Sequence, residues 1–433
     1  MVGILDLPTE IFDLILDETE LFTYSPRDRY SNIYKYEFRS GLKIALACRQ
    51  FYKVVLPRLY ATCHVNFKET KDGYFAFHTP IRSTAAKYKA YRRHGDFVRN
   101  LFITTWGSSY YDPDYRTTIV KKCYRSVPEL VGLLLPSFDN LRLASFDRRP
   151  KVPLKDFIDG IRLVLSSCKA LKTLELSIDY TATDDLDALI DAKETGDWPA
   201  NLPAAVARPT ELRFYLQENI KGPRSDPVRL WPMELMDKVL GESCRGVKIL
   251  KFSHDVAQNS MTRSQRKRIG WLRNVSDRRW WFPALEKVEM GMGRGTMWAV
   301  DEYLDVDFAQ VKEVSLSQLR YLEYPDEEEV TVLLEFLDRC KSMKMLQFSF
   351  PENTTCLAAV LRARRQLPSL KEVRVLLAVE DELMEEIMED FGGDYRGEVT
   401  QGSRYDPDET VILHLDSEEE DKLVPEMRNL VVS

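Results

Sequence analysis

The chain has 433 residues, 44% of them hydrophobic, and a formal net charge of −7. This length is too great for one ordinary core, so we expect two or more domains or one repeat array. The mild negative charge gives no reason to expect a nucleic acid as the main partner. No apolar run approaches the ~20 residues needed to cross a bilayer, and no basic flank of a secretory signal precedes one. The seven cysteines include no Cys-x-x-Cys pair, which favours a reducing cytoplasmic or nuclear setting without a zinc site or disulfides.

Residues 7–16 predict a short helix that is apolar on two sides. Pro8 suits the first helical position, and Glu10 and Asp13 place negative charge near the positive helix end. A helix that is apolar on two sides must bury both. Because a short N-terminal helix has little of its own domain to cover it, one side is expected to face a partner protein. The two stripes consist of Ile11, Leu14 and Ile15, and of Phe12 and Leu16.

Residues 44–56 predict a second helix that also carries an apolar stripe. Its apolar residues recur at helical spacing, and Pro57 is expected to stop it directly after Leu56. The stripe consists of Ile44, Ala47, Cys48, Phe51 and Val55.

Together these two stretches resemble an F-box, the module that docks onto the Skp-type linker of cullin–RING ubiquitin ligases. The opening Leu-Pro-x-Glu-Ile, the later Cys-basic-x-aromatic and the closing Leu-Pro-x-Leu-Tyr look like the fungal version of that family. Residues 19–41 are a longer spacer than the family usually has. The resemblance implies an F-box-like helical domain over residues 1–62, with the transfer chemistry left to other subunits. The linker-binding residues that it implies are Leu7, Pro8, Ile11, Leu14, Ile15, Leu46, Cys48 and Phe51.

A six-residue pattern, apolar-x-x-apolar-x-apolar, recurs through the rest of the chain. A Lys, Arg or Glu usually follows the first apolar residue, and residues 211–216 are a candidate degenerate copy. Helix-like segments lie between copies, at 154–165, 233–240, 330–337 and 356–361. The alternation predicts a mixed α/β fold of helices and parallel strands over residues 63–415, stacked as an irregular solenoid that resembles leucine-rich repeats. The clear copies are at 98–103, 138–143, 171–176, 247–252, 285–290, 311–316, 343–348 and 370–375.

Cys168, Cys244 and Cys340 each lie three residues before the first apolar residue of a copy. A catalytic thiol would occur once, whereas a cysteine at one repeat position suggests a small buried residue at a helix end.

The polar residues between the apolar ones are expected to form a row on one sheet face, because side chains alternate between faces. Solenoids commonly bind partners on such a face, so we expect a protein substrate held by hydrogen bonds and ion pairs. A rival surface is the basic cluster at 263–279, which includes Arg266, Lys267 and Arg268 and would favour a phosphorylated or acidic target. Ordinary solvent exposure of charged residues, without any binding role, explains either surface equally well. The row consists of Glu175, Lys251, Glu289, Ser315, Gln347 and Arg374.

Nothing in the sequence supports catalysis, and we expect no cofactor and no metal. The five histidines are isolated, and Gly291, Gly293 and Gly295 lack both the dinucleotide fingerprint and a following Lys-Ser/Thr. An enzyme with a nucleotide or phosphate site at 291–295 remains the alternative from another class. An F-box protein acting outside ubiquitination is the other alternative. Residues 416–433 are expected to be an acidic, loosely held tail after a last strand at 411–415.

Overall fold

The computed structural model describes part of the chain, which divides into two compact units. Unit 1 is Met1–Glu175 with Asn201–Ala207, and unit 2 is Leu176–Ala200 with Arg208–Ser433. The described residues are 11, 14, 43–47, 49–69, 75–77, 91–106, 127–148, 154–180, 205–218, 240–256, 282–291, 308–317, 337–349, 367, 369–377, 395–400 and 409–415.

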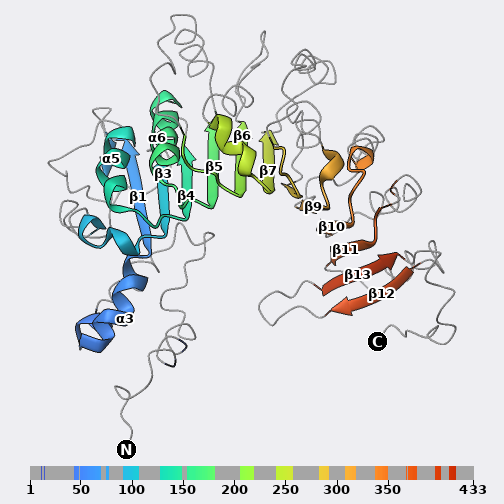
Figure 1. Ribbon diagram of the computed structural model, residues 1–433, viewed down its shortest axis with the longest axis horizontal. Helices are drawn as coiled ribbons and strands as arrows, with labels where there is room; N and C mark the ends of the chain where they lie inside the picture. The colour runs from blue at the N-terminus through green and yellow to red at the C-terminus, as the bar shows by residue number, and fades with distance from the viewer. Residues whose placement is uncertain are drawn as a thin grey trace, which may run out of the picture. The chain divides into compact units, whose positions relative to one another are not determined.

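Unit 1 is built on parallel strands, with α5 and α6 on one face (Figure 1). Strand β1 pairs with β3 and β3 with β4, so that Cys63, Leu101 and Ala144 lie side by side, and the short β2 is antiparallel to β1. The elements are α3 (Arg49–Tyr60), β1 (Thr62–Glu69), β2 (Phe75–Phe77), η3 (Gly95–Phe97), β3 (Asn100–Trp106), α5 (Val127–Leu134), η4 (Leu135–Ser137), β4 (Leu143–Arg148), α6 (Leu154–Ser167) and the start of β5 (Thr173–Tyr180).

Helix α6 falls on the predicted segment 154–165 and buries one apolar stripe. Phe157, Ile161 and Val164, spaced by four and three residues, are fully buried. Gly160 allows a close helix contact, because a Cβ there would lie 2.7 Å from Val127 Cγ1 of α5.

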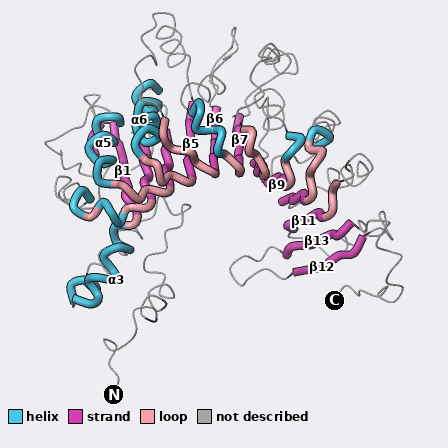
Figure 2. Tube along the Cα trace, in the orientation of Figure 1, coloured by secondary structure: helices cyan, strands magenta, loops and turns pink. Residues whose placement is uncertain are grey.

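Unit 2 contains strands that follow one another in the sheet in chain order (Figure 2). Strands β6 to β11 are parallel, β13 is antiparallel to β11, and β12 is antiparallel to β13. The elements are β6 (Glu211–Glu218), η6 (Gly241–Gly246), β7 (Ile249–Val256), β8 (Lys287–Gly291), η8 (Phe308–Gln310), β9 (Glu313–Ser317), β10 (Met345–Ser349), β11 (Glu372–Leu377), β12 (Tyr395–Thr400) and β13 (Glu409–Leu415).

The repeated apolar pattern forms a buried ladder across these strands, which confirms the prediction of a mixed α/β fold with parallel strands. Leu212, Leu250, Val288, Val314 and Leu346 are in register and buried. Val373 continues the register. The predicted core residues Leu171 and Leu174 of unit 1 and Leu176 of unit 2 are buried as well.

A turn closed by one recurring hydrogen bond precedes the clear copies of the pattern, and it shifts one predicted strand. In each turn the amide of the first apolar residue donates to the carbonyl of a buried residue three positions earlier. The expected strand at 138–143 is wrong by three residues, because Phe138 occupies this turn and β4 begins at Leu143, with Ala144 and Phe146 in the core. The turn residues are Gly95, Phe138, Cys168, Cys244, Phe282, Phe308, Cys340 and Leu367.

Helix α3 also differs from the sequence prediction. It continues past Pro57 to Tyr60, although Pro57 was expected to end it. Proline removes only one amide donor here, and the extra turn buries Leu59 against Ala45 and Val55. The domain boundaries expected at 62 and 415 stay predictions, and helix-like segments at 233–239, 330–336 and 356–361 lie outside the described residues.

Candidate functional site

The polar side chains of unit 2 form a row across its parallel strands. The register places Lys251 beside Glu289, Glu289 beside Ser315, Ser315 beside Gln347, and Gln347 beside Arg374. These are five of the six residues that the sequence assigned to the substrate face. Arg213 of β6 extends the row beside Lys251, and sequence reasoning missed it although it lies inside the degenerate copy at 211–216.

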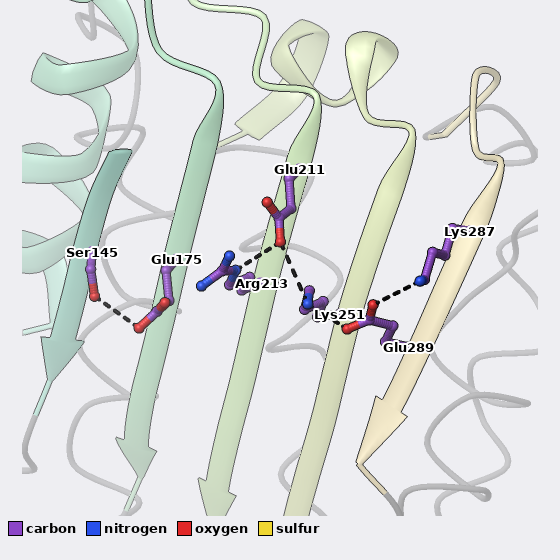
Figure 3. Close-up of polar contacts among 7 residues, drawn as sticks. All are labelled: Ser145, Glu175, Glu211, Arg213, Lys251, Lys287 and Glu289. Atoms are coloured by element: carbon purple, nitrogen blue, oxygen red, sulfur yellow. Dashed lines mark hydrogen bonds and ion pairs between the residues drawn. The ribbon is translucent and has the colours of Figure 1, made fainter. Parts of the chain in front are cut away.

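Charged residues of this row and their neighbours on the same sheet face form a connected network of ion pairs (Figure 3). Arg213 Nε donates to Glu211 Oε1 at 2.8 Å, and Lys251 Nζ lies 2.5 Å from Glu289 Oε2 and 3.8 Å from Glu211 Oε1. The network continues on the same face of β8 and β9, where Lys287 Nζ lies 3.3 Å from Glu289 Oε1 and 3.5 Å from Glu313 Oε2. Arg374 pairs with Glu372 further along.

Glu289 is the centre of this network. Half-burial by itself raises the pKa of its carboxyl, but hydrogen bonds and charge from Lys251 and Lys287 lower the pKa below its ordinary value overall. Glu289 is therefore ionised at neutral pH. Arg213, Lys251 and Lys287 together balance Glu211, Glu289 and Glu313, so this network is polar without a net charge. A partner that binds this face would have to replace the internal ion pairs with ion pairs of its own. Such an exchange contributes more to the specificity of binding than to its affinity.

Glu175, the sixth predicted row residue, lies in unit 1 and is buried rather than open. It is 2% exposed and accepts a hydrogen bond from Ser145 Oγ at 3.0 Å. Figure 3 shows the two side chains reaching toward each other between β4 and β5. Ser145, Asp147 and Thr104 are buried too. A carboxylate can be buried only when hydrogen bonds offset its desolvation, and Ser145 supplies one. Ser315 is similarly close to full burial.

The N-terminal helical residues expose large apolar side chains. Ile11, Leu14 and Leu46 are 43%, 59% and 70% exposed. Phe51, by contrast, is half-buried and packs against the cluster of Ala45, Val55 and Leu59. The other expected linker contacts, Leu7, Pro8, Ile15 and Cys48, and the insertion at 19–41 lie outside the described residues.

The two other candidate sites, the basic cluster at 263–279 and the glycine-rich segment at 291–295, lie mostly outside the described residues. Arg266, Lys267 and Arg268 lie outside the described residues, as do Gly293 and Gly295. Gly291 is the last residue of β8. Within the described ranges, no His, Cys, Asp and Glu side chains group as metal ligands would, and no helix is long and apolar enough to span a membrane.

The recurring cysteines are buried free thiols at the turns. Burial raises the pKa of Cys168 to about 12, and the negative charge of Asp139 adds to the effect. Burial also raises the pKa of Cys340 to about 12, although Arg339 opposes it. A neutral thiol is a poor nucleophile, so neither residue is suited to nucleophilic catalysis.

We predict that Cys168 and Cys340 resist alkylation by iodoacetamide at pH 8 in the folded protein and react fully in 6 M guanidinium, as measured by peptide mass spectrometry. Because their folded pKa values lie above the unfolded value near 9, stability is intact below pH 9 and falls as the pH rises from 9 toward 12. Rapid labelling of native Cys168 at pH 8 would contradict its burial.

No protein-family model matches this chain, and no curated protein matches it. Among solved structures, it is similar to a Bacteroides fragilis protein studied as a structural-genomics target, at 12% identity and a TM-score of 0.30, over 66% of this chain and 67% of that one. It is also similar to a release-factor-specific protein-(glutamine-N5) methyltransferase from Alicyclobacillus acidocaldarius, at 15% identity and a TM-score of 0.19, over 30% of this chain and 80% of that one. Likenesses at these TM-scores carry no argument about fold or function.

Proposed function

We propose that the chain is the substrate-recognition adaptor of a cullin–RING ubiquitin ligase of the SCF type. In this proposal the N-terminal F-box-like helices bind a Skp-type linker, and an irregular leucine-rich-repeat-like solenoid holds a protein substrate. The observation that carries the proposal is the exposure of Ile11, Leu14 and Leu46 in helical residues of the N-terminal segment.

An exposed apolar helix face favours a protein partner. Burying a leucine or isoleucine side chain gains about 1.5–3 kcal/mol, so leaving three exposed is unfavourable unless a partner covers them. Adjacent large apolar residues on a surface commonly mark a protein–protein interaction site. The two-helix sequence resemblance identifies the Skp-type linker as the partner to test.

The repeat part of the proposal rests on strand order and register. Strands β6 to β11 of unit 2 follow chain order and share one buried apolar ladder, and β7 to β11 begin after similar turns. Each repeat unit covers its neighbour in such an array, which accounts for a continuous core built from short segments.

The linker prediction compares two variants that replace exposed apolar residues. Ile11→Gln with Leu14→Gln should weaken linker binding on the order of tenfold or more, because truncating an interface anchor costs about 1–2 kcal/mol. Leu133→Gln in α5 should leave binding unchanged, since Leu133 is 43% exposed, like Ile11, but lies outside the N-terminal helices. Affinity for a purified Skp-type linker, measured by calorimetry, tests this.

Co-purification from cells separates the alternatives. A linker that brings a cullin supports the ubiquitin-ligase role. A linker without a cullin indicates an F-box protein acting outside ubiquitination. Failure to bind any Skp-type linker, with the protein folded, would overturn the proposal.

The substrate prediction concerns the polar row of unit 2. Reversing the charge at Lys251 would bring a third carboxylate beside those of Glu211 and Glu289. Neutral substitutions therefore test the row more cleanly. We expect Lys251→Met with Arg374→Met to reduce substrate capture severalfold, and Lys169→Met, at an exposed turn, to leave it unchanged. Quantitative pull-down of ubiquitinated candidates measures this effect. If capture survives these changes but is lost after neutralising Arg266, Lys267 and Arg268, the basic cluster is the substrate site instead.

A further inference from the structure

Strand β12 lies at one end of the unit 2 sheet and has a neighbouring strand on one side only. It pairs with β13, and no described strand lies beyond it (Figure 1). Within the described part of the chain, the outward-facing amide and carbonyl groups of β12 therefore have no strand to bind. Such an edge is a template for an added strand, and proteins often block it with proline. The sequence of β12, Tyr395-Arg-Gly-Glu-Val-Thr400, has no proline, so every residue keeps its amide donor.

The residues of β12 continue both faces of the sheet in register. Through β13, Gly397 is in register with Val373 of the apolar ladder. Glu398 is in register, in the same way, with Arg374 of the polar row. Arg396 shares the face of Glu398, because residues alternate between faces along a strand. A strand added at this edge has to keep that alternation, since a shift by one residue would move its apolar positions to the polar face.

The residue order of β12 is complementary to itself when two copies run antiparallel. If Gly397 is opposite Gly397 of the second copy, Arg396 of each copy is opposite Glu398 of the other. Tyr395 is then opposite Val399, and both kinds of cross-strand pair are favourable. The two neighbouring registers that keep the faces place Arg396 opposite Arg396, or Glu398 opposite Glu398, and like charges across strands are unfavourable. Of these three registers, only the one centred on Gly397 pairs opposite charges.

We propose that the protein forms a two-fold dimer in which β12 pairs antiparallel with β12 of a second copy about Gly397. The contact is isologous, since each copy contributes the same strand. Main-chain hydrogen bonds supply the affinity, and the charges of Arg396 and Glu398 select the register. A glycine inside a strand commonly marks a place where another backbone approaches closely, which fits the centre of the pair. One pair of short strands is a small interface, so we expect a dissociation constant of about 10–100 μM.

The dimer places the polar faces of two copies of unit 2 on the same side of one continuous sheet. A two-fold axis that relates adjacent antiparallel strands is perpendicular to the sheet, so it exchanges the copies without turning either face over. The polar row is therefore presented twice. A substrate with two recognised segments would be bound more tightly by the dimer than by one copy. This last consequence rests on the proposed substrate role of the row, whereas the dimer itself does not.

Charge reversal at the two paired positions tests the dimer in the full chain. Arg396→Glu alone, or Glu398→Arg alone, places like charges opposite each other at both ends of the strand pair. We expect each variant to weaken self-association about tenfold or more, as measured by sedimentation velocity over a concentration series at low salt. Lys169→Glu, at an exposed turn of unit 1, is the matched control reversal and should leave self-association unchanged.

Mixing the Arg396→Glu chain with the Glu398→Arg chain gives the decisive measurement. In the mixed dimer every cross-strand charge pair again joins opposite charges, so association should return to near the parental strength. Two misfolded chains would not recover in this way, and neither linker nor substrate binding enters the result. The proposal is overturned if the parent chain stays monomeric up to about 100 μM. Single variants that associate as strongly as the parent, or a mixture that stays monomeric, would also overturn it.

Discussion

Gly95→Ala should be among the most destabilising single substitutions in unit 1. A Cβ at this position would lie 1.9 Å from the carbonyl oxygen of Ser137 and 2.6 Å from both its carbonyl carbon and its Cβ. The obstacle is mainly backbone rather than the flexible end of a side chain, so η3 and η4 would have to separate. Overpacking of this kind costs about 1–3 kcal/mol and more where backbone must move, and we expect a loss of roughly 3 kcal/mol or more.

Gly132→Ala is the matched control and should have the opposite sign. Gly132 lies inside α5, where an added Cβ would meet nothing within 4 Å. Alanine is favoured over glycine in a helix by roughly 0.5–1 kcal/mol, so this variant should be slightly more stable than the parent. Urea unfolding of the two variants measures both effects. Equal midpoints for Gly95→Ala and the parent would contradict the close contact between η3 and η4.

The strands of unit 2 were predictable because burial on a sheet follows a period of two. Leu250, Val288 and Val314 stand at matching pattern positions, and the structure places them side by side. The polar residue that follows each of them is then placed on the other face by the same alternation. This is why the row of Lys251 and Glu289 could be named from the sequence.

The turns were only partly predictable because their buried position accepts several residue types. The sequence marked Cys168, Cys244 and Cys340 as one recurring position, but Phe138 and Phe282 fill equivalent turns. A pattern based on residue identity misses such substitutions, since the turn constrains burial and apolar character rather than one side chain. This ambiguity also produced the three-residue error at β4.

Individual polar contacts were beyond the sequence for a different reason. The Ser145–Glu175 hydrogen bond joins two strands, and its formation depends on cross-strand register and on rotamers. The alternation rule places Glu175 on the face away from the core but says nothing about what covers that face. The register alone would likewise not show that Lys251 contacts both Glu211 and Glu289.

Leu174→Ala should strongly destabilise unit 1, and Leu133→Ala should not. Leu174 is fully buried in β5, whereas Leu133 in α5 is 43% exposed. Truncating a buried leucine removes its transfer free energy and leaves a cavity, at a cost of about 2–5 kcal/mol. The exposed leucine loses only part of its apolar contact, so we expect less than about 1 kcal/mol there.

The comparison of these two truncations tests the assignment of the repeated pattern, because both variants make the same chemical change. A single domain is stabilised by only about 5–15 kcal/mol, so the Leu174 variant should show a clearly lower urea midpoint with little change in slope. If the two variants unfold at the same urea concentration, position 174 is not an inward-facing position of a packed strand. The apolar pattern at 171–176 would then have to be explained by another structure, and the same doubt would extend to the matching copies of unit 2.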